Sequence, residues 1–315
     1  MSKPLAVVAV GGNALIRDDQ HMALADQYDA VCETATHVAT MVQAGWNVVL
    51  THGNGPQVGF ILRRSEIADG QVPTVPVQYA VGDTQGAIGF MFQNALGNAL
   101  LRLGLRVPVV TLVTQTLVDR SDAAFAKPDK PIGSFLTQEV AQLLAAQLGW
   151  SVMQDGDRGW RRTIASPQPV RVIEAPLIER LAREGSVIIA CGGGGIAVED
   201  VGGGELRGVE AVIDKDRASA LLAIQMKAEL LMIPTGVPRV AIRFGQPGQT
   251  WLDKISVAQA ERYAAEGHFG AGSMGPKVEA LLAFVKGRAG GRGVITNAQN
   301  IARALRGETG TWIEA

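Results

Sequence analysis

The chain has 315 residues, of which 47% are hydrophobic, and its 29 basic and 30 acidic side chains give a formal net charge of −1. This composition excludes a disordered chain, and the charge balance offers no electrostatic footprint for nucleic acid or an anionic membrane. Two cysteines, Cys32 and Cys191, support neither a disulfide scaffold nor a cysteine zinc site. No apolar run reaches the roughly 20 residues of a membrane span, and no signal peptide precedes the first strand. We therefore expect a cytoplasmic protein that binds neither nucleic acid nor membrane.

Short apolar runs alternate with helical patterns in the first third of the chain. In chain order, the sequence predicts a strand at Leu5–Val10, a helix at Asp29–Gly45, a strand at Trp46–Thr51, a helix at Thr84–Leu103 and a strand at Val107–Val113. The alternation returns with a strand at Val187–Cys191, a helix at Asp216–Lys227, a strand at Glu229–Ile233, a helix at Pro276–Lys286, a strand at Gly293–Thr296 and a helix at Ala298–Leu305. Apolar strands joined by helices favour an α/β fold with a mainly parallel sheet covered on both faces.

Two stretches interrupt this rhythm. Asp119–Pro169 contains a predicted helix at Thr137–Leu148 and a hairpin whose strands are Trp150–Gln154 and Trp160–Ile164. We interpret residues 119–169 as a small protruding subdomain inserted in a single domain that covers residues 1–315. Gly195–Val212 is a second predicted hairpin, which turns at three consecutive glycines.

Three predicted strands end in glycine clusters. These clusters contain Gly11, Gly12 and Asn13; Gly53, Asn54 and Gly55; and Gly192–Gly195. Ligands of open α/β sheets bind at the carboxyl ends of the strands, where glycine lets backbone N–H groups approach an anion. A single cluster would fit an ordinary turn equally well, but three equivalent clusters predict a phosphate site.

The third cluster also matches a dinucleotide-binding pattern, G-x-G-x-x-A, through Gly192, Gly194 and Ala197. That reading, an NAD-dependent oxidoreductase, needs a helix directly after the glycines. The predicted hairpin at this place argues against it.

Three lysines lie in stiff or helix-initial segments close to these loops. Lys130 stands between two prolines, Lys215 begins a helix beside Asp216, and Lys277 follows Pro276 at another helix start. Phosphoryl transfer depends on positioning and on neutralising charge, which fixed lysines supply. Asp216 either orients these lysines or serves only as a first-turn carboxylate of its helix.

These residues resemble the carbamate kinase family of the amino acid kinase superfamily nearly from end to end. The resemblance rests chiefly on T-H-G-N-G-P-Q-V-G at 51–59 and E-A-V-I-D-K-D at 210–216, with further matches at 11–15, 85–89, 130–133, 160–162, 166–169, 192–195 and 272–278.

The resemblance implies a three-layer αβα sandwich around a mainly parallel eight-stranded sheet, and a homodimer. It implies reversible transfer of a phosphoryl group from carbamoyl phosphate to ADP, which gives ATP and carbamate, with Mg²⁺ bound through the nucleotide phosphates. By this resemblance the first two glycine clusters would hold the phosphoryl group through backbone N–H groups, and Lys130 would reach over carbamoyl phosphate. Lys215 and Lys277 would neutralise phosphate charge, oriented by Asp216, and the nucleotide would also contact Thr235, Gly236 and Met274.

The chain departs from the family pattern after the strand Glu229–Ile233. The family has roughly T-D-V-D-G-V-Y there, whereas this chain has T-G-V-P-R-V-A at 235–241, without the carboxylates and with Arg239. The departure leaves two alternatives to a carbamate kinase: a relative that uses another carbamoyl or acyl phosphate, and a non-catalytic ligand-binding protein.

Overall fold

A computed structural model describes residues 3–12, 15, 16, 18, 20–270 and 273–314. Its centre is an eight-stranded sheet in the order β15 (Lys254–Ser256), β17 (Thr311–Glu314), β16 (Arg292–Thr296), β12 (Leu230–Pro234), β1 (Leu5–Val10), β2 (Asn47–His52), β9 (Val187–Ile189) and β3 (Val109–Thr111). Every neighbouring pair is parallel except β16 and β17. The predicted mainly parallel sheet is confirmed.

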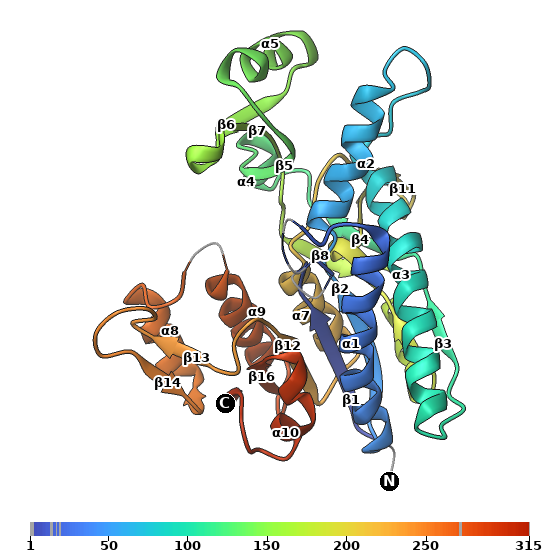
Figure 1. Cartoon of the computed structure of the whole chain (residues 1–315), viewed down its shortest axis with the longest axis vertical. Coiled ribbons are helices and arrows are strands. Elements are labelled where there is room, and N and C mark those ends of the chain that lie inside the picture. Colours follow the sequence, from blue (N-terminus) through green and yellow to red (C-terminus); the bar gives the residue numbers. More distant parts are fainter. Residues whose placement is uncertain (1–2, 13–14, 17, 19, 271–272, 315) are drawn as a thin grey trace.

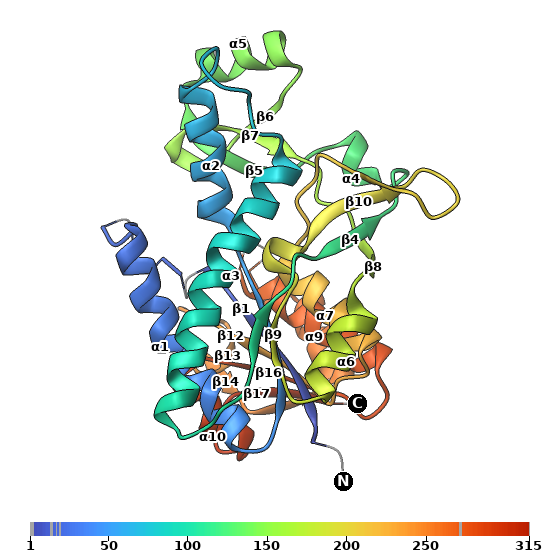
Figure 2. The same ribbon diagram turned by 90° about the vertical axis from the view of Figure 1, so that its right-hand side faces the viewer.

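Helices cover both faces of this sheet (Figures 1 and 2). Strand β1 is fully buried, and its side chains alternate between the two faces as the period of a strand requires. Leu5, Val7 and Ala9 belong to one hydrophobic cluster, whereas Ala6 and Val8 belong to the other. One cluster includes α6 (Ala175–Arg183), α7 (Lys215–Gln225), α8 (Val257–Ala265) and α9 (Met274–Gly287), and the other includes α1 (Leu24–Gln43), α3 (Val77–Arg102) and α10 (Ile301–Leu305).

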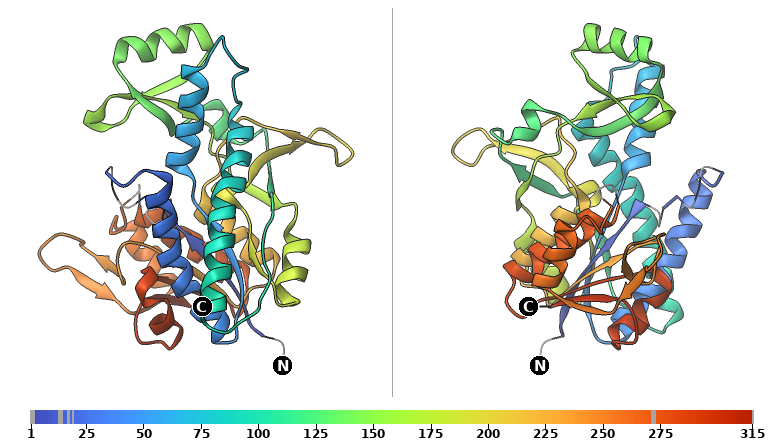
Figure 3. Two further views of the ribbon diagram at one scale, coloured as in Figure 1. Left: turned by 45° about the vertical axis from the view of Figure 1, so that its right-hand side comes forward. Right: turned by 90° about the vertical axis from the view of Figure 1, so that its left-hand side faces the viewer.

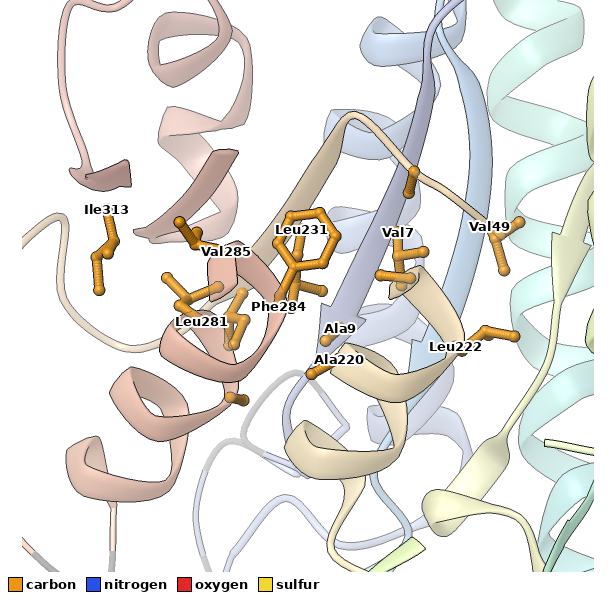
Figure 4. Packing of buried hydrophobic residues seen from close by; sticks show 14 of the residues in the cluster. Val7, Ala9, Val49, Ala220, Leu222, Leu231, Leu281, Phe284, Val285 and Ile313 are labelled. Carbon is orange, nitrogen blue, oxygen red and sulfur yellow. The ribbon is translucent and has the colours of Figure 1, made fainter. Parts of the chain in front are cut away.

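Figure 4 shows the first of these clusters, in which Val7 and Val49 of the sheet pack beside Leu222 of α7 and Phe284 of α9. The predicted three-layer αβα sandwich is therefore the observed fold. No helix in the described part of the chain is long and apolar enough to cross a membrane.

A second sheet of four strands lies beside the first, and the sequence did not predict it. Its order is β11 (Leu206–Gly208), β10 (Ile196–Asp200), β4 (Gln115–Val118) and β8 (Pro169–Val172). The β10–β11 pair is the predicted hairpin of Gly195–Val212. Because a strand, not a helix, follows the glycines, the dinucleotide-binding reading is wrong.

Strands β4 and β8 also bracket the predicted insertion, since Val118 pairs with Pro169. Between them the chain forms a separate sheet of β5 (Lys130–Leu136), β7 (Trp160–Ile164) and β6 (Ser151–Gln154), with α4 (Ala123–Ala126) and α5 (Gln138–Leu148). Figure 3 shows these elements standing away from the central sheet, and β5 packs alongside α2 (Gly55–Ile67). The last hairpin, β13 (Val240–Ile242) and β14 (Thr250–Leu252), projects from the opposite part of the molecule (Figure 1).

Candidate active site

Four neighbouring strands of the central sheet end at one edge. Because β12, β1, β2 and β9 are consecutive and parallel, their carboxyl ends bring together Thr235, Gly11, Gly53 and the segment that starts at Cys191. This edge is where open α/β sheets bind ligands. The three glycine clusters of the sequence therefore meet as predicted, joined by the loop after β12.

Gly11 and Gly12 line a cavity of about 480 Å³ at this edge. A Cβ atom added to Gly12 would meet nothing within 4 Å, so its backbone faces open space. The cavity is also lined by Pro234, Thr235, Gly236, Ser273, Lys277 and residues of α1 and of the 297–299 turn. Asn13, the third residue of this predicted phosphate loop, lies outside the described residues.

Gly53 serves a different purpose from the one expected. Its N–H donates to the carbonyl of Val10 at 3.0 Å, so this group is not free to bind a phosphate. A Cβ atom on Gly53 would lie 3.2 Å from the nitrogen of Gly12. Gly53 therefore lets the two glycine loops approach each other, and the expectation that its own N–H contacts the phosphoryl group is wrong.

The N-terminus of α2 follows Gly53. The N–H groups of Gly55 and Gln57 precede the first intrahelical bond, which Val58 donates to the Asn54 carbonyl at 2.9 Å. The Asn54 side chain is buried and donates to the Thr84 hydroxyl at 2.8 Å. The backbone of this helix start, and not the Asn54 amide, is thus suited to an anion.

The Gly192–Gly195 loop packs under these residues without space for side chains. A Cβ atom on Gly192 would lie 2.5 Å from a ring carbon of His52, and one on Gly193 would lie 2.1 Å from the Asn54 amide nitrogen. Gly193, Gly194 and Gly195 also have φ angles of 65°, 91° and 89°, which favour glycine. This cluster therefore packs against the residues of the site and holds them in place.

Asp216 holds two of the predicted lysines. Its Oδ1 lies 2.5 Å from Nζ of Lys215, and its Oδ2 lies 3.1 Å from Nζ of Lys277. The Asp216 side chain is 5% exposed, and the lysines are 11% and 17% exposed. Lys215 also donates to the Ala9 carbonyl at 3.2 Å, which fixes it beneath the end of β1. Asp216 therefore fits both alternatives, because it lies in the first turn of its helix and also orients two lysines.

Burial shapes the electrostatics of this cluster. Desolvation lowers the pKa of Lys215 below its ordinary value, although the charge of Asp216 counteracts part of that effect. An ammonium group held in a partly dry environment interacts more strongly with a phosphate than one in water does. The cluster thus combines two positive charges with one negative charge beside the glycine loops.

Lys130 approaches the same helix from β5 and lies 3.3 Å from Oδ2 of Asp214. Asp214 is the N-cap of α7, since its side chain accepts from the N–H groups of Asp216 and Arg217. The sequence carried a signal for this cap, an aspartate directly before a helix. It carried none for the contact with Lys130, which lies 84 residues away in the chain.

A second cavity of about 670 Å³ continues from the first, and both share Thr235, Gly236 and Ser273. Met274, Arg239, Arg243, Phe244 and His268 are among its other lining residues. Arg239 pairs with Asp253 at 2.7 Å, so the charge that this loop gains is offset locally. The predicted nucleotide residues Thr235, Gly236 and Met274 therefore line one continuous hollow that reaches Lys277.

The fold and this site define a phosphoryl-transfer class of protein: the chain belongs to the amino acid kinase family, whose model matches residues 4–297. It is 46% identical over 314 residues to the carbamate kinase-like protein YahI of Escherichia coli, with 99% of each chain covered. It is 45% identical to the carbamate kinase of Thermococcus kodakarensis, with 98% of each covered. The Giardia lamblia carbamate kinase bound to AMP-PNP superposes with a TM-score of 0.93 at 37% identity, covering 99% of this chain and 98% of that one. The predicted family resemblance is confirmed.

Proposed function

We propose that the protein transfers a phosphoryl group reversibly between carbamoyl phosphate and ADP. The bond from phosphorus to the carbamate oxygen breaks, and a bond from phosphorus to a terminal oxygen of ADP forms, so that carbamate and ATP are the products. The observation that carries this proposal is the Lys215–Asp216–Lys277 cluster beside the glycine loops, in a chain about 45% identical to carbamate kinases over nearly its full length.

In this mechanism the side chains position the substrates and neutralise phosphate charge, and none of them forms a covalent bond to phosphorus. The N–H groups around Gly12 and at the start of α2 would hold the transferred phosphoryl group. Lys215 and Lys277 would offset the charge that spreads over its oxygens in the transition state, and Lys130 would contact carbamoyl phosphate. Asp216 would keep both ammonium groups in place.

Mg²⁺ would accompany the nucleotide. Both carboxylate oxygens of Asp214 and of Asp216 already contact protein groups. Mg²⁺ in kinases is held largely by substrate phosphates and water, so it needs no cage of protein ligands. These two carboxylates therefore need not ligate the ion, and Mg²⁺ held through the nucleotide phosphates would reduce the negative charge of those phosphates.

The nucleotide would occupy the larger cavity. Its phosphates would point toward Lys277, and its base and ribose would lie among Gly236, Met274 and Phe244, which line that cavity. Arg239 and Arg243 on the same lining offer hydrogen-bond donors and no acceptors. We therefore propose weaker or less base-selective nucleotide binding than the family pattern gives.

The departure from the family pattern at residues 235–241 also supports two alternatives. The protein could transfer a phosphoryl group from another carbamoyl or acyl phosphate, or it could bind ligand without turnover. One relative at 46% identity is named only as carbamate kinase-like. A coupled assay of ATP formation from MgADP separates these functions when carbamoyl phosphate and acetyl phosphate are compared. Turnover with carbamoyl phosphate alone supports the first proposal. No turnover with either, together with thermal stabilisation by ADP, supports a binding protein.

We also propose that the protein is a homodimer, formed through the outer face of α3 and the edge strand β3. Tyr79, Phe90 and Leu101 are 67%, 66% and 59% exposed. They recur every eleven residues, close to three helical turns, and so form one stripe. Val110 of the edge strand β3 and Val113, which follows it, add exposed apolar side chains, and β3 lies beside α3 (Figure 1). Exposed apolar surface at an unpaired edge is suited to a second copy of the chain.

A further inference from the structure

The two oxygens of the Asp214 carboxylate contact different parts of the molecule. Oδ1 accepts from the N–H of Asp216 at 2.9 Å and from that of Arg217 at 3.2 Å, at the start of α7. Oδ2 lies 3.3 Å from Nζ of Lys130, the first residue of β5. The Asp214 side chain is 20% exposed and that of Lys130 is 38% exposed. One carboxylate therefore bridges the inserted segment and the helix that carries Lys215.

Asp214 carries a full negative charge at neutral pH. Burial alone would raise the pKa of its carboxyl group, but the charge of Lys130, the N–H of Arg217 and the charge of Lys215 hold that pKa below its ordinary value. An asparagine in its place would keep an oxygen for the helix cap and lose the charge that faces Lys130.

The chain around Asp214 is fixed on two sides. The N–H of Val212 donates to the carbonyl of Ala165 at 3.0 Å, next to β7. On the other side, the carbonyl of Ile213 would lie 2.5 Å from a Cβ atom on Gly194, so the glycine loop packs closely against it. A flexible lysine side chain that pairs with this fixed carboxylate has fewer conformations to lose when substrate binds.

We propose that Asp214 is a positioning residue, which aims Lys130 at the phosphoryl donor and ties the inserted segment to the helix that bears Lys215 and Asp216. This inference rests on the proposed function, in which Lys130 contacts carbamoyl phosphate. The glycine loops and the Lys215–Asp216–Lys277 cluster do not depend on it.

The test is a double-mutant cycle with Asp214→Asn and Lys130→Met. We expect Asp214→Asn to raise KM for carbamoyl phosphate about tenfold, the effect of losing one charged hydrogen bond, with a smaller change in kcat and an unchanged Tm. In the Lys130→Met background the same substitution should change KM by less than about twofold. Glu210→Gln is the matched control, because Glu210 pairs with Arg162 of the insertion at 3.4 Å but is 53% exposed. It should leave KM within about twofold.

An equal KM increase in both backgrounds, or a loss of kcat and Tm at constant KM, would show that Asp214 acts only as a helix cap. Hydrogen exchange of the free protein gives a second readout that does not need turnover. Amides of residues 127–136 should exchange faster in Asp214→Asn and in Lys130→Met, with no further increase in the double variant. Unchanged exchange in Asp214→Asn would overturn the proposal. An inactive wild-type protein with the expected exchange pattern would overturn the proposed function and the aiming of Lys130 at the donor, and would support only the tie that Asp214 makes between the inserted segment and α7.

Discussion

Lys277 and Lys286 lie on the same helix, α9, in contrasting surroundings. Lys277 contacts buried Asp216, whereas Lys286 is half-exposed and pairs with Glu261. We predict that Lys277→Ala, and likewise Lys215→Ala, lowers turnover at least about a hundredfold, or about 2.7 kcal/mol, because one transition-state charge contact is lost. Lys286→Ala should leave turnover unchanged. Steady-state kinetics of ATP formation checks this, and near-normal turnover of Lys215→Ala would contradict the mechanism.

Gly12 offers a direct test of the phosphate site. A side chain at this position meets nothing within 4 Å and would enter the cavity where the transferred phosphoryl group is proposed to bind, so Gly12→Val should abolish ATP binding while Tm stays close to that of the wild type. Gly53→Val is less selective, since its side chain would press on the backbone of Gly12 and lower Tm as well. Calorimetry and thermal unfolding on both variants separate the two effects. Unchanged ATP affinity in Gly12→Val would exclude this loop from the phosphoryl site.

His52 gives the fold a dependence on pH. The ring is buried, stacks on Phe92 at 5.9 Å and abuts Gly192, and burial lowers its pKa to about 4. In the unfolded chain, His52 takes up a proton near its ordinary pKa of 6.5, whereas in the folded protein it does so only near pH 4. The free energy of unfolding is therefore highest above pH 6.5 and decreases as the pH falls toward 4. We expect the neutral ring to account for about 3 kcal/mol of the acid destabilisation.

Denaturant unfolding between pH 4 and 7.5 measures this effect. His52→Gln should have a flatter pH profile than the wild type, even if its Tm is lower at pH 7.5. His37→Gln, a change on α1 outside the site, is the control and should keep the wild-type profile. Parallel profiles for the wild type and His52→Gln would assign the acid sensitivity to other groups.

The loop between β12 and β13 is the element in which this chain departs from its family. Gly236 has open space around it and faces both cavities, so an aspartate fits there. Gly236→Asp combined with Arg239→Gly should raise selectivity for ADP over GDP about fivefold, roughly 1 kcal/mol, by restoring hydrogen-bond acceptors at the ribose and base end. Calorimetric titration with both nucleotides tests this. Tight, ADP-selective binding by the wild type with no gain in the variant would mean that the loop is neutral.

The elements that the sequence predicted best are those with strong local signals. The apolar run of β1, the paired hairpin strands β6 and β7, and α7 after Asp214 all lie where expected, within a residue or two. Helix α3 begins at Val77 instead of Thr84, although Pro76 directly before it was a start signal. Helix α2 was missed because its first residues were assigned to the Gly53–Gly55 loop, despite Pro56 at its start.

The sequence carried no signal for contacts between residues that lie far apart in the chain. The use of the Gly53 N–H by Val10, the contact of Asn54 with Thr84, and the ion pair of Lys130 with Asp214 are tertiary facts without a local pattern. By contrast, Lys215 and Lys277 could be selected because each begins a helix, and helix starts at one sheet edge converge. Residue type and element ends thus predicted the residues of the candidate site, while the contacts of its supporting groups needed the fold.

At the scale of the whole molecule, we propose one domain with a single insertion. The central sheet includes both β1, which starts at Leu5, and β17, which ends at Glu314, so the two ends of the chain share one core. The insertion leaves and rejoins this body through the paired strands β4 and β8.

The proposed dimer belongs to the same scale. Phe90 lies at the centre of the α3 stripe, 66% exposed, between Tyr79 and Leu101. Phe90→Glu would place a charge against its symmetry mate in an isologous interface, so we expect the dimer to dissociate into monomers of 33.2 kDa. Leu143→Glu is the matched control, since Leu143 is 55% exposed on α5 of the insertion and should leave the dimer intact. Sedimentation velocity decides between these outcomes: a monomeric wild type, or a dimer that survives Phe90→Glu but not Leu143→Glu, would exclude the α3 face as the interface.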